Sequence, residues 1–290
     1  MRLRSTFAIA APAAFGLILA ALPASADVIP ALHDALPEEY RDGIDAAVFN
    51  DWPPDEFMHD GELVGWSVDI AHEMEERLGV PFTYTATSFD AIIPGLVARR
   101  FDAGFSSFGS TPERLTELDF IPQRKIGTAF AIPVSSELQI ATEEDVCGVS
   151  VAVLSGGWDN QLLETMSQES CVDAGLVAVD IQQHQTQNSA ELAVQSGRAE
   201  TTFASSAKMA YLAAQTGQFR VSDLVLQPVY SNIGVRRGDP LAQVMADAIQ
   251  TMIDDGTYVE IMAKWGLDDS GMLEEALVIT LENPEDTMGN

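Results

Sequence analysis

Hydrophobic residues recur at helical spacing in several separate stretches of the chain, with short apolar runs between them. In the stretch 64–79, Val68, Ala71, Met74 and Leu78 lie on one side, and Gly79 ends the pattern. This spacing predicts a helix that buries one face. The same pattern predicts further helices at 88–100, 158–169, 189–198, 206–217, 240–256 and 257–266.

Short apolar runs between these helices have the length and bounding residues of strands. They predict strands at 81–87, 101–108, 149–155, 176–181 and 200–205. Alternating strands and helices are typical of an α/β fold with parallel sheets covered on both faces. The alternation occurs in two runs, 46–130 and 148–228, and therefore indicates two α/β lobes.

The N-terminus has the layout of a secretory signal peptide. A positively charged head precedes an apolar run and the small residues Ala24, Ser25 and Ala26. Pro12 and Pro23 interrupt the run, which is short for a membrane helix. We therefore expect residues 1–26 to be removed after Ala26 and the rest of the chain to be periplasmic.

The charge of the chain narrows the classes of partner. It has 15 Lys and Arg against 44 Asp and Glu, and the signal peptide contains two of the basic residues, Arg2 and Arg4, which leaves 13 against 44, or −31. Such a balance argues against nucleic acids and anionic membranes as partners. It indicates either a cationic partner or solubility in a salty habitat, and we favour solubility because the acids are spread along the chain.

The two cysteines, Cys147 and Cys171, predict one disulfide in an oxidising compartment. No CxxC motif or Cys/His cluster accompanies them, and the common hydrolase, metalloprotease and phosphate-loop motifs are missing from the sequence. The sequence therefore predicts no metal, no cofactor and no catalytic residue.

The segment SSFGSTPER, residues 106–114, carries the strongest local signal for a binding site. Thr111, Pro112 and Glu113 predict the start of a helix, where free backbone N–H groups attract anions. Arg114 can turn its planar guanidinium toward the same point and bind a carboxylate. The alternative is an ordinary capped helix whose arginine pairs with a neighbouring acid, Glu113 or Glu117.

Four stretches, taken in order, resemble the polar amino-acid-binding family of periplasmic solute-binding proteins, which serve ABC importers; they are 60–79, 88–120, 196–217 and 231–267. The resemblance implies two Rossmann-like lobes joined by two crossing strands, near 132–134 and 229–230, with the solute between them. Lobe 1 would comprise 27–131 and 231–290, and lobe 2 would comprise 132–230. A membrane permease would be the partner of a monomeric protein.

The resemblance also implies roles for individual residues. Arg114 matches the arginine that clamps the ligand carboxylate, together with the N–H of Gly109 or its neighbour. Ser107 matches a position whose carbonyl accepts from the ligand ammonium, with Ser106 beside it.

Three more matched positions would enclose the ligand. Trp52 matches an aromatic cover and Phe89 a second apolar wall. Gly157 and Trp158 match the point where lobe 2 offers hydroxyl and N–H groups to the carboxylate.

The chain departs from the family pattern at two places. The family usually has threonine or serine at Gly157-Trp158, and an aspartate that binds the ammonium at Ser205. One hypothesis is an aromatic box that holds a hindered or delocalised cation, made by Trp52, Phe89 and Trp158. The other is that a different acid supplies the charge, with Asp51, Asp55 and Asp159 as candidates.

We expect a receptor that catalyses no reaction and binds an amino acid or a similar carboxylate-bearing zwitterion. A betaine- or ectoine-like compatible solute is an alternative. The family's scaffold also hosts a dehydratase, so an enzyme is a further and less favoured alternative. A sensor that presents the bound solute to a receptor has the same sequence features.

Overall fold

The computed structural model describes residues 28–267 and 271–284, so the predicted signal peptide lies outside the described residues. Eight strands form the main sheet: β1 Ile44–Val48, β5 Phe82–Ala86, β6 Ala103–Phe108, β7 Leu118–Pro133, β8 Ser150–Leu154, β9 Asp180–His184, β10 Thr201–Ser205 and β11 Phe219–Arg236. A small antiparallel sheet has three more: β2 Asp51–Trp52, β3 Glu56–His59 and β4 Glu62–Val64.

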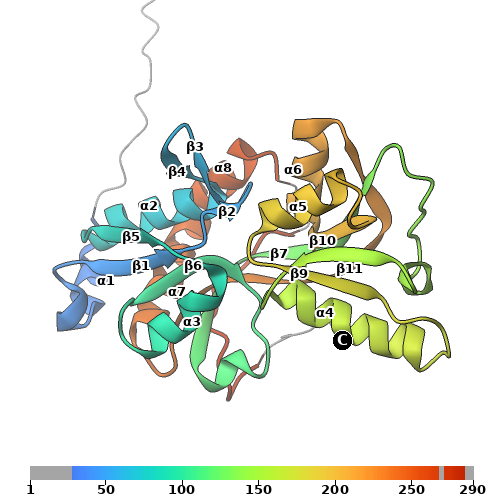
Figure 1. Cartoon of the computed structure of the whole chain (residues 1–290). Helices are drawn as coiled ribbons and strands as arrows, with labels where there is room; N and C mark the ends of the chain where they lie inside the picture. Colours follow the sequence, from blue (N-terminus) through green and yellow to red (C-terminus); the bar gives the residue numbers. More distant parts are fainter. Residues whose placement is uncertain (1–27, 268–270, 285–290) are drawn as a thin grey trace, which may run out of the picture.

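The α-helices are α1 Pro30–Ala35, α2 Trp66–Leu78, α3 Phe89–Val97, α4 Trp158–Met166, α5 Gln187–Gln195, α6 Ser206–Thr216, α7 Leu241–Asp255 and α8 Thr257–Lys264. Short 3₁₀ turns are η1 Glu38–Tyr40, η2 Arg114–Thr116 and η3 Glu143–Val146, and the π-helical turn η4 Ser167–Val172 extends α4. Helices cover both faces of the sheet, which confirms the predicted α/β fold (Figure 1).

The order of the main sheet is β5-β1-β6-β11-β7-β10-β8-β9. We call the part built on β5, β1 and β6 the first half, and the part built on β10, β8 and β9 the second half. Neighbouring strands are parallel within each half, as the sequence predicts. The long strands β7 and β11 lie between the halves and run antiparallel to each other.

β7 and β11 belong to both halves. They pair from Leu118↔Arg236 to Pro133↔Phe219, with three shifts of register. β6 pairs with one end of β11, and β10 pairs with the opposite end of β7. The sheet is therefore mixed: the predicted parallel pairing holds within each half, and the chain crosses between the halves on one long strand and returns on the other.

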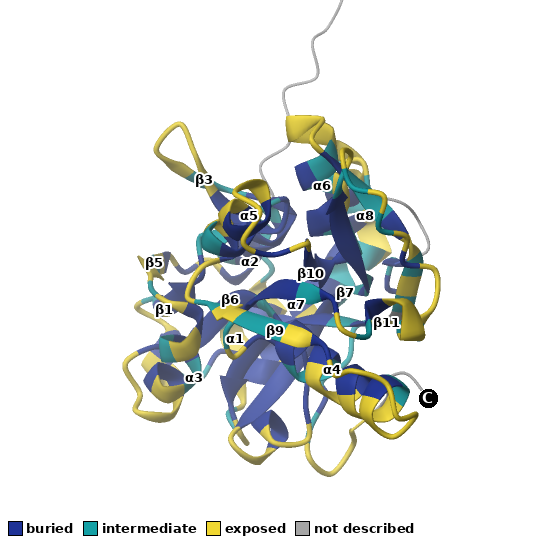
Figure 2. Cartoon of the chain, turned by 45° about the vertical axis from the view of Figure 1, so that its right-hand side comes forward, coloured by how far each residue is buried: buried dark blue, intermediate teal, exposed yellow. Residues whose placement is uncertain are grey.

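The core follows the alternation of side chains along the strands. In the first half, α1, α2, α7 and α8 pack over the face that carries Ala46 and Phe105, while α3 covers the face that carries Ala47 and Phe108. Residues one or three positions apart in a strand point to opposite faces, so both faces of these strands are buried (Figure 2).

In the second half, α4 packs on Val151 and Val153, and α5 and α6 pack on the opposite face, which carries Ala152 and Ala204. The apolar cluster on that opposite face continues into the first half, where it includes Phe49, Trp52 and Phe89. The two halves are therefore in direct apolar contact at this junction.

Two predicted elements differ from the structure. The strand predicted at 176–181 begins later, at Asp180, and Leu176 and Val177 are exposed. The helix predicted to start at Thr111 is only a turn followed by η2, although the Thr111 hydroxyl accepts from the Arg114 N–H at 3.3 Å, as a cap does. The turn ends after three residues because β7 starts at Leu118.

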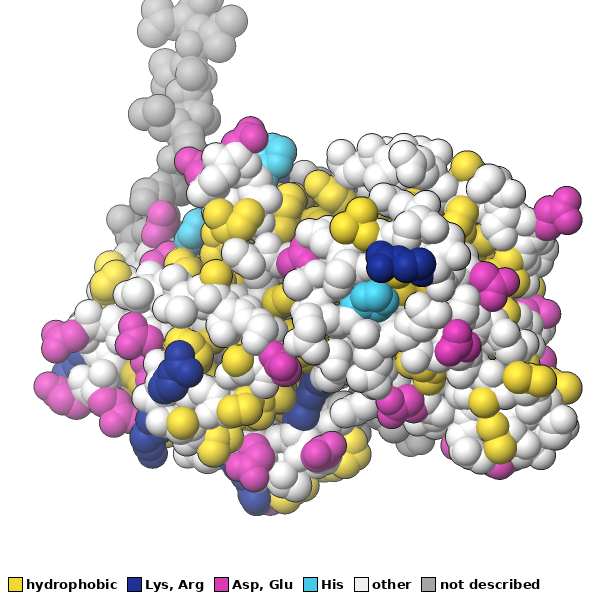
Figure 3. Space-filling view, viewed as in Figure 1, with side chains coloured by type: hydrophobic (Ala, Val, Ile, Leu, Met, Phe, Trp, Pro, Cys, Tyr) yellow, Lys and Arg dark blue, Asp and Glu magenta, His cyan; other side chains and the backbone are white. Residues whose placement is uncertain are grey.

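No helix within 28–267 and 271–284 is long and apolar enough to span a membrane. Acidic side chains are scattered over the face shown in Figure 3 and do not gather at one point. This distribution agrees with a charge that serves solubility.

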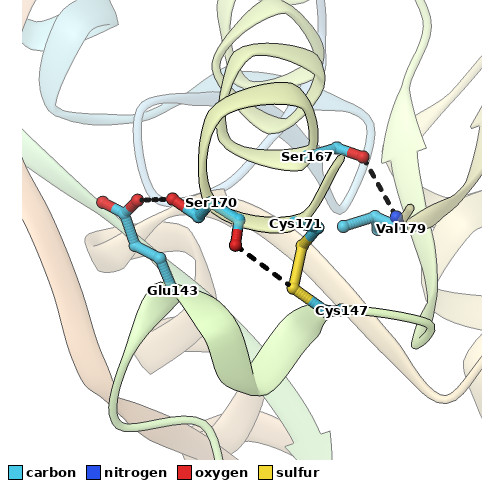
Figure 4. The surroundings of a disulfide bond; sticks show 6 residues. All are labelled: Glu143, Cys147, Ser167, Ser170, Cys171 and Val179. Atoms are coloured by element: carbon cyan, nitrogen blue, oxygen red, sulfur yellow. Dashed lines mark hydrogen bonds between the residues drawn. A yellow bond between two sulfur atoms is a disulfide. The ribbon is translucent and has the colours of Figure 1, made fainter. Parts of the chain in front are cut away.

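The predicted disulfide joins Cys147, at the end of η3, to Cys171, in η4 (Figure 4). Cys171 is fully buried, and the neighbouring Ser167 hydroxyl accepts from the Val179 N–H at 3.0 Å. The disulfide therefore fixes the end of the extended α4 helix to the loop that precedes β8.

Replacing Cys147 and Cys171 together by alanine should lower the free energy of unfolding by about 3 kcal/mol, because the bond closes a loop with a sequence separation of 24. Urea unfolding of the variant and of the parent protein measures this difference. Equal midpoints for the two proteins would contradict a stabilising role.

Candidate functional site

The candidate site lies where the two halves meet, at the carboxyl ends of strands β1, β6, β8 and β10. This edge is where open α/β sheets bind ligands. A groove of about 510 Å³ opens there, lined by Phe49, Asn50 and Asp51 from the first half and by Thr186 and Asn188 from the second.

Arg114 connects the halves at this junction. Its Nη1 donates to the Gly109 carbonyl at 2.9 Å, and its Nη2 donates to the Gly156 carbonyl of the second half at 2.8 Å. Each of these nitrogens carries a second N–H, so the fork can still donate to a carboxylate. Burial lowers the pKa of Arg114 to about 10, partly offset by the charge of Asp159, and it stays positive at neutral pH.

Neither Glu113 nor Glu117, the alternative partners of Arg114, forms an ion pair with it in the described residues, although the charge of Glu113 favours the charged form of the arginine. Its guanidinium carbon instead lies 5.5 Å from the centre of the Phe89 ring. The carboxylate clamp itself stays a prediction.

Trp158, the first residue of α4, packs directly on Gly109. A Cβ atom added to Gly109 would lie 2.7 Å from the Trp158 side chain. Gly157 is the N-cap of the same helix. The large residue at position 158 therefore fits because position 109 has no side chain.

Two of the three residues of the predicted aromatic box share one apolar wall. The Phe49 ring lies 6.4 Å from Trp52 and 5.9 Å from Phe89, measured between centroids. Trp158 makes no ring contact with this wall in the part of the chain that the structure describes. Sequence reasoning missed Phe49, which directly follows the buried strand β1.

Ser106 and Ser205 use their hydroxyl groups on the backbone. The Ser106 hydroxyl accepts from the Phe49 N–H at 2.8 Å and donates to the Phe105 carbonyl at 2.7 Å. The Ser205 hydroxyl caps α6 by accepting from the Lys208 N–H at 3.3 Å. Both serines hold the backbone at the edge of the site.

Three buried carboxyl groups at the junction form no ion pair with a described residue: Asp55 and Glu56 from the first half and Asp159 from the second. Ser107, which has a positive φ of 46°, directs its hydroxyl to Asp55 at 2.7 Å and to Glu56 at 3.1 Å. Asp55 also accepts from the indole N–H of Trp66 at 2.8 Å. Asp55 and Asp159 were sequence candidates, whereas Glu56 was missed.

Burial raises the pKa of all three acids. The pKa of Asp55 rises to about 6, although bonds from Ser107 and Trp66 favour the charged form. The pKa of Asp159 rises to about 7, although Arg114 favours its charged form. Glu56 has a pKa well above its usual 4.5, because burial is reinforced by the charge of Asp55.

Asp51 and Lys208 complete the polar groups of the junction. Asp51 accepts from the backbone N–H of Asn188 at 3.1 Å and from its side-chain amide, which links β2 to the start of α5. Lys208, buried in the first turn of α6, forms an ion pair with Glu191 at 3.0 Å. Sequence reasoning missed Lys208. The feature that could have indicated it is a cation in the first turn of a helix, where the helix macrodipole disfavours positive charge.

Within the described residues, no group of three or more His, Cys, Asp or Glu side chains could hold a metal ion. The predicted absence of a cofactor remains a sequence-based expectation.

The mixed sheet and the site between its halves define an α/β binding protein with a cleft between two lobes. A model of the family described as bacterial extracellular solute-binding proteins, family 3, matches residues 44–268, and the chain belongs to this family. The resemblance stated from the sequence is therefore confirmed.

The arginine-binding protein ArgT of Corynebacterium glutamicum is 30% identical over 261 residues, which are 87% of this chain and 84% of that protein. The solved structure of an ancestral arginine-binding protein bound to arginine has a TM-score of 0.71 and 26% identity, covering 78% of this chain and 98% of that one. An ancestral amino-acid-binding protein that is a precursor of cyclohexadienyl dehydratase has a TM-score of 0.69 and 26% identity, covering 78% and 96%.

The buried acids predict a dependence of stability on pH. Asp55 and Asp159 bind protons more tightly in the folded chain than in the unfolded one, so their contribution to stability is present at pH 4 and is lost toward pH 7. The free energy of unfolding should fall less steeply between pH 4 and pH 7 in Asp159→Asn than in the parent protein. In the control Asp223→Asn, at an exposed position, it should fall as steeply as in the parent protein. Urea unfolding at pH 4, 5, 6 and 7 measures the slope, and equal slopes for all three proteins would contradict this account.

Proposed function

We propose that this protein is the solute-binding component of an ABC importer and binds an amino acid with a positively charged side chain, arginine first, between its two halves. The observation that carries the proposal is the set of three buried carboxyl groups without an ion pair among the described residues, Asp55, Glu56 and Asp159, near the buried Arg114. No reaction is part of this function.

The charges of the site match the two ends of such a ligand. The remaining N–H groups of Arg114 suit a carboxylate, since a guanidinium can donate two parallel hydrogen bonds to it. The three acids outnumber this arginine, and an ammonium or guanidinium would offset their charge. A basic amino acid carries one carboxylate and two positive groups.

The relatives support the same class of ligand. ArgT is named for arginine, and an ancestral arginine-binding protein with a TM-score of 0.71 has been solved bound to arginine and also bound to glutamine. A quaternary betaine fits less well, because it has no N–H to donate to the oxygen of Glu56 that lacks a partner within the described chain.

The location and the partner follow from this role. The protein would be released into the periplasm, bind its solute as a monomer, and present the form in which the halves enclose the solute to a membrane permease. Asp51 and Asn188 support such a closed form, since their hydrogen bonds join the two halves directly.

A second candidate is an enzyme that uses acid catalysis on the same scaffold. It is favoured by Asp159, whose pKa of about 7 suits a general acid, and by the likeness to a precursor of cyclohexadienyl dehydratase. Incubation with a cyclohexadienyl substrate distinguishes the two: turnover abolished by Asp159→Asn would replace the receptor proposal.

A thermal-shift screen tests the ligand class. Arginine, lysine and ornithine should each raise the melting temperature, because a ligand stabilises the folded state to which it binds. Glutamate, betaine and ectoine should leave it unchanged at the same concentration. A shift with betaine or ectoine alone would favour the aromatic box and contradict the proposed ligand.

Replacing Arg114 by alanine should weaken arginine binding by several kcal/mol, because the ligand carboxylate would lose a charged donor in a buried site. Isothermal titration calorimetry measures the loss, and thermal melting verifies that the variant is folded. Arg41→Ala, at a partly exposed surface arginine, is the matched control and should bind normally. Unchanged affinity of the Arg114 variant would exclude the clamp.

A further inference from the structure

Asp55 and Glu56 share one hydrogen-bond donor. The Ser107 hydroxyl lies 2.7 Å from Asp55 Oδ2 and 3.1 Å from Glu56 Oε2. A hydroxyl has a single proton and can donate it to only one acceptor at a time. When both carboxyl groups are ionised, one of these two contacts therefore has no proton.

One oxygen of the Asp55–Glu56 pair has no hydrogen-bond donor within the described chain. Glu56 Oε1 is buried and has no hydrogen-bond partner in 28–267 or 271–284, and the Trp52 indole N–H is also buried and unpaired there. Trp52 pairs with Glu56 across β2 and β3, so both groups belong to one turn. Buried polar atoms are normally satisfied, and an exception of this kind indicates a missing partner.

Other charges near the pair do not supply that partner. Asp55 interacts electrostatically with Arg124 and Lys208, but Lys208 forms its ion pair with Glu191 at 3.0 Å. Among the ion pairs of the described residues, none includes Asp55 or Glu56. Asp159, from α4, faces Asp55 with like charge and adds to the deficit.

The pair lies at the junction of the halves. Ser107 is two residues before Gly109, which contacts Trp158 of the second half and accepts from Arg114. Asp55 interacts with Lys208 and Asp159, both in the second half. A ligand whose carboxylate binds to Arg114 would therefore be close to the pair.

We propose that Asp55 and Glu56 form the subsite for a positively charged nitrogen of the ligand, with Ser107 holding the two carboxyl groups together. This inference rests on the proposed function. It assigns the cation site to the first half, whereas the family's usual ammonium-binding aspartate is replaced by the neutral Ser205 in the second half. An ammonium or guanidinium supplies several N–H donors and can satisfy Glu56 Oε1 while it offsets both charges.

The subsite has a measurable consequence in protons. Near pH 6 the pair is partly protonated, because burial raises the pKa of both acids and the charge of Asp55 raises that of Glu56 further, while hydrogen bonds and nearby cations only partly oppose the rise for Asp55. A bound cation favours the ionised carboxyl groups, so the proton leaves to the buffer as the ligand binds. Asp159, which also titrates near this pH, faces Asp55 and Arg114, so it is tested separately.

The experiment is calorimetric titration with L-arginine of the parent protein, Glu56→Gln, Asp55→Asn and the matched control Glu62→Gln, an exposed acid on the neighbouring strand β4. Glu56→Gln and Asp55→Asn should each weaken binding about tenfold to a hundredfold, and the control should not change it. Thermal melting identifies variants that do not fold. If Asp55→Asn does not fold, the affinity of Glu56→Gln alone tests the subsite.

Titration at pH 6 in two buffers with different heats of ionisation counts the released protons. On binding arginine, the parent protein and Asp159→Asn should each release a fraction of a proton per bound ligand. Glu56→Gln should release much less. Normal affinity and proton release in Glu56→Gln would overturn the subsite while the proposed function stands. Failure of the parent protein to bind any basic amino acid would instead overturn the proposed function.

Discussion

The antiparallel ladder between β7 and β11 is the constraint on which the rest of the structure depends. It is the only continuous backbone pairing between the two halves among the described strands, since β6 joins one end of it and β10 the other. Two long strands can twist and bend as one ribbon while their hydrogen bonds persist. The register shifts along this ladder interrupt its regularity between the two ends, which is where a hinge would have to act.

Everything else that joins the halves is made of side chains or single backbone groups. Arg114 donates to one carbonyl in each half, Asp51 accepts from the start of α5, and Trp158 rests on Gly109. The apolar cluster that includes Phe49, Trp52 and Phe89 adds direct packing between the halves at the same junction. The buried acids give this junction its chemistry, because removing them from water costs free energy that a cation of the right shape can offset.

The sequence predicted the elements with strong periodicity, such as α2, and it predicted that the segment from Ser106 to Arg114 is a turn that contains an arginine-based site, of which the turn is seen and Arg114 is buried. It did not predict the full extent of β7, because Pro122 and Gly127 interrupt the apolar run that would mark a long strand. Nor could it predict that Glu56 meets Ser107, since that contact joins residues 51 positions apart and depends on the pairing of β2 with β3.

The contact between Gly109 and Trp158 has a consequence for the history of the protein. An indole can occupy the start of α4 only because the facing residue has no side chain, and any larger residue at position 109 would collide with it. Neither position can therefore change freely while the other is kept. A lineage that acquired a hydroxyl-bearing residue at 109 would first need a smaller one at 158, so the order of such substitutions is constrained by steric fit.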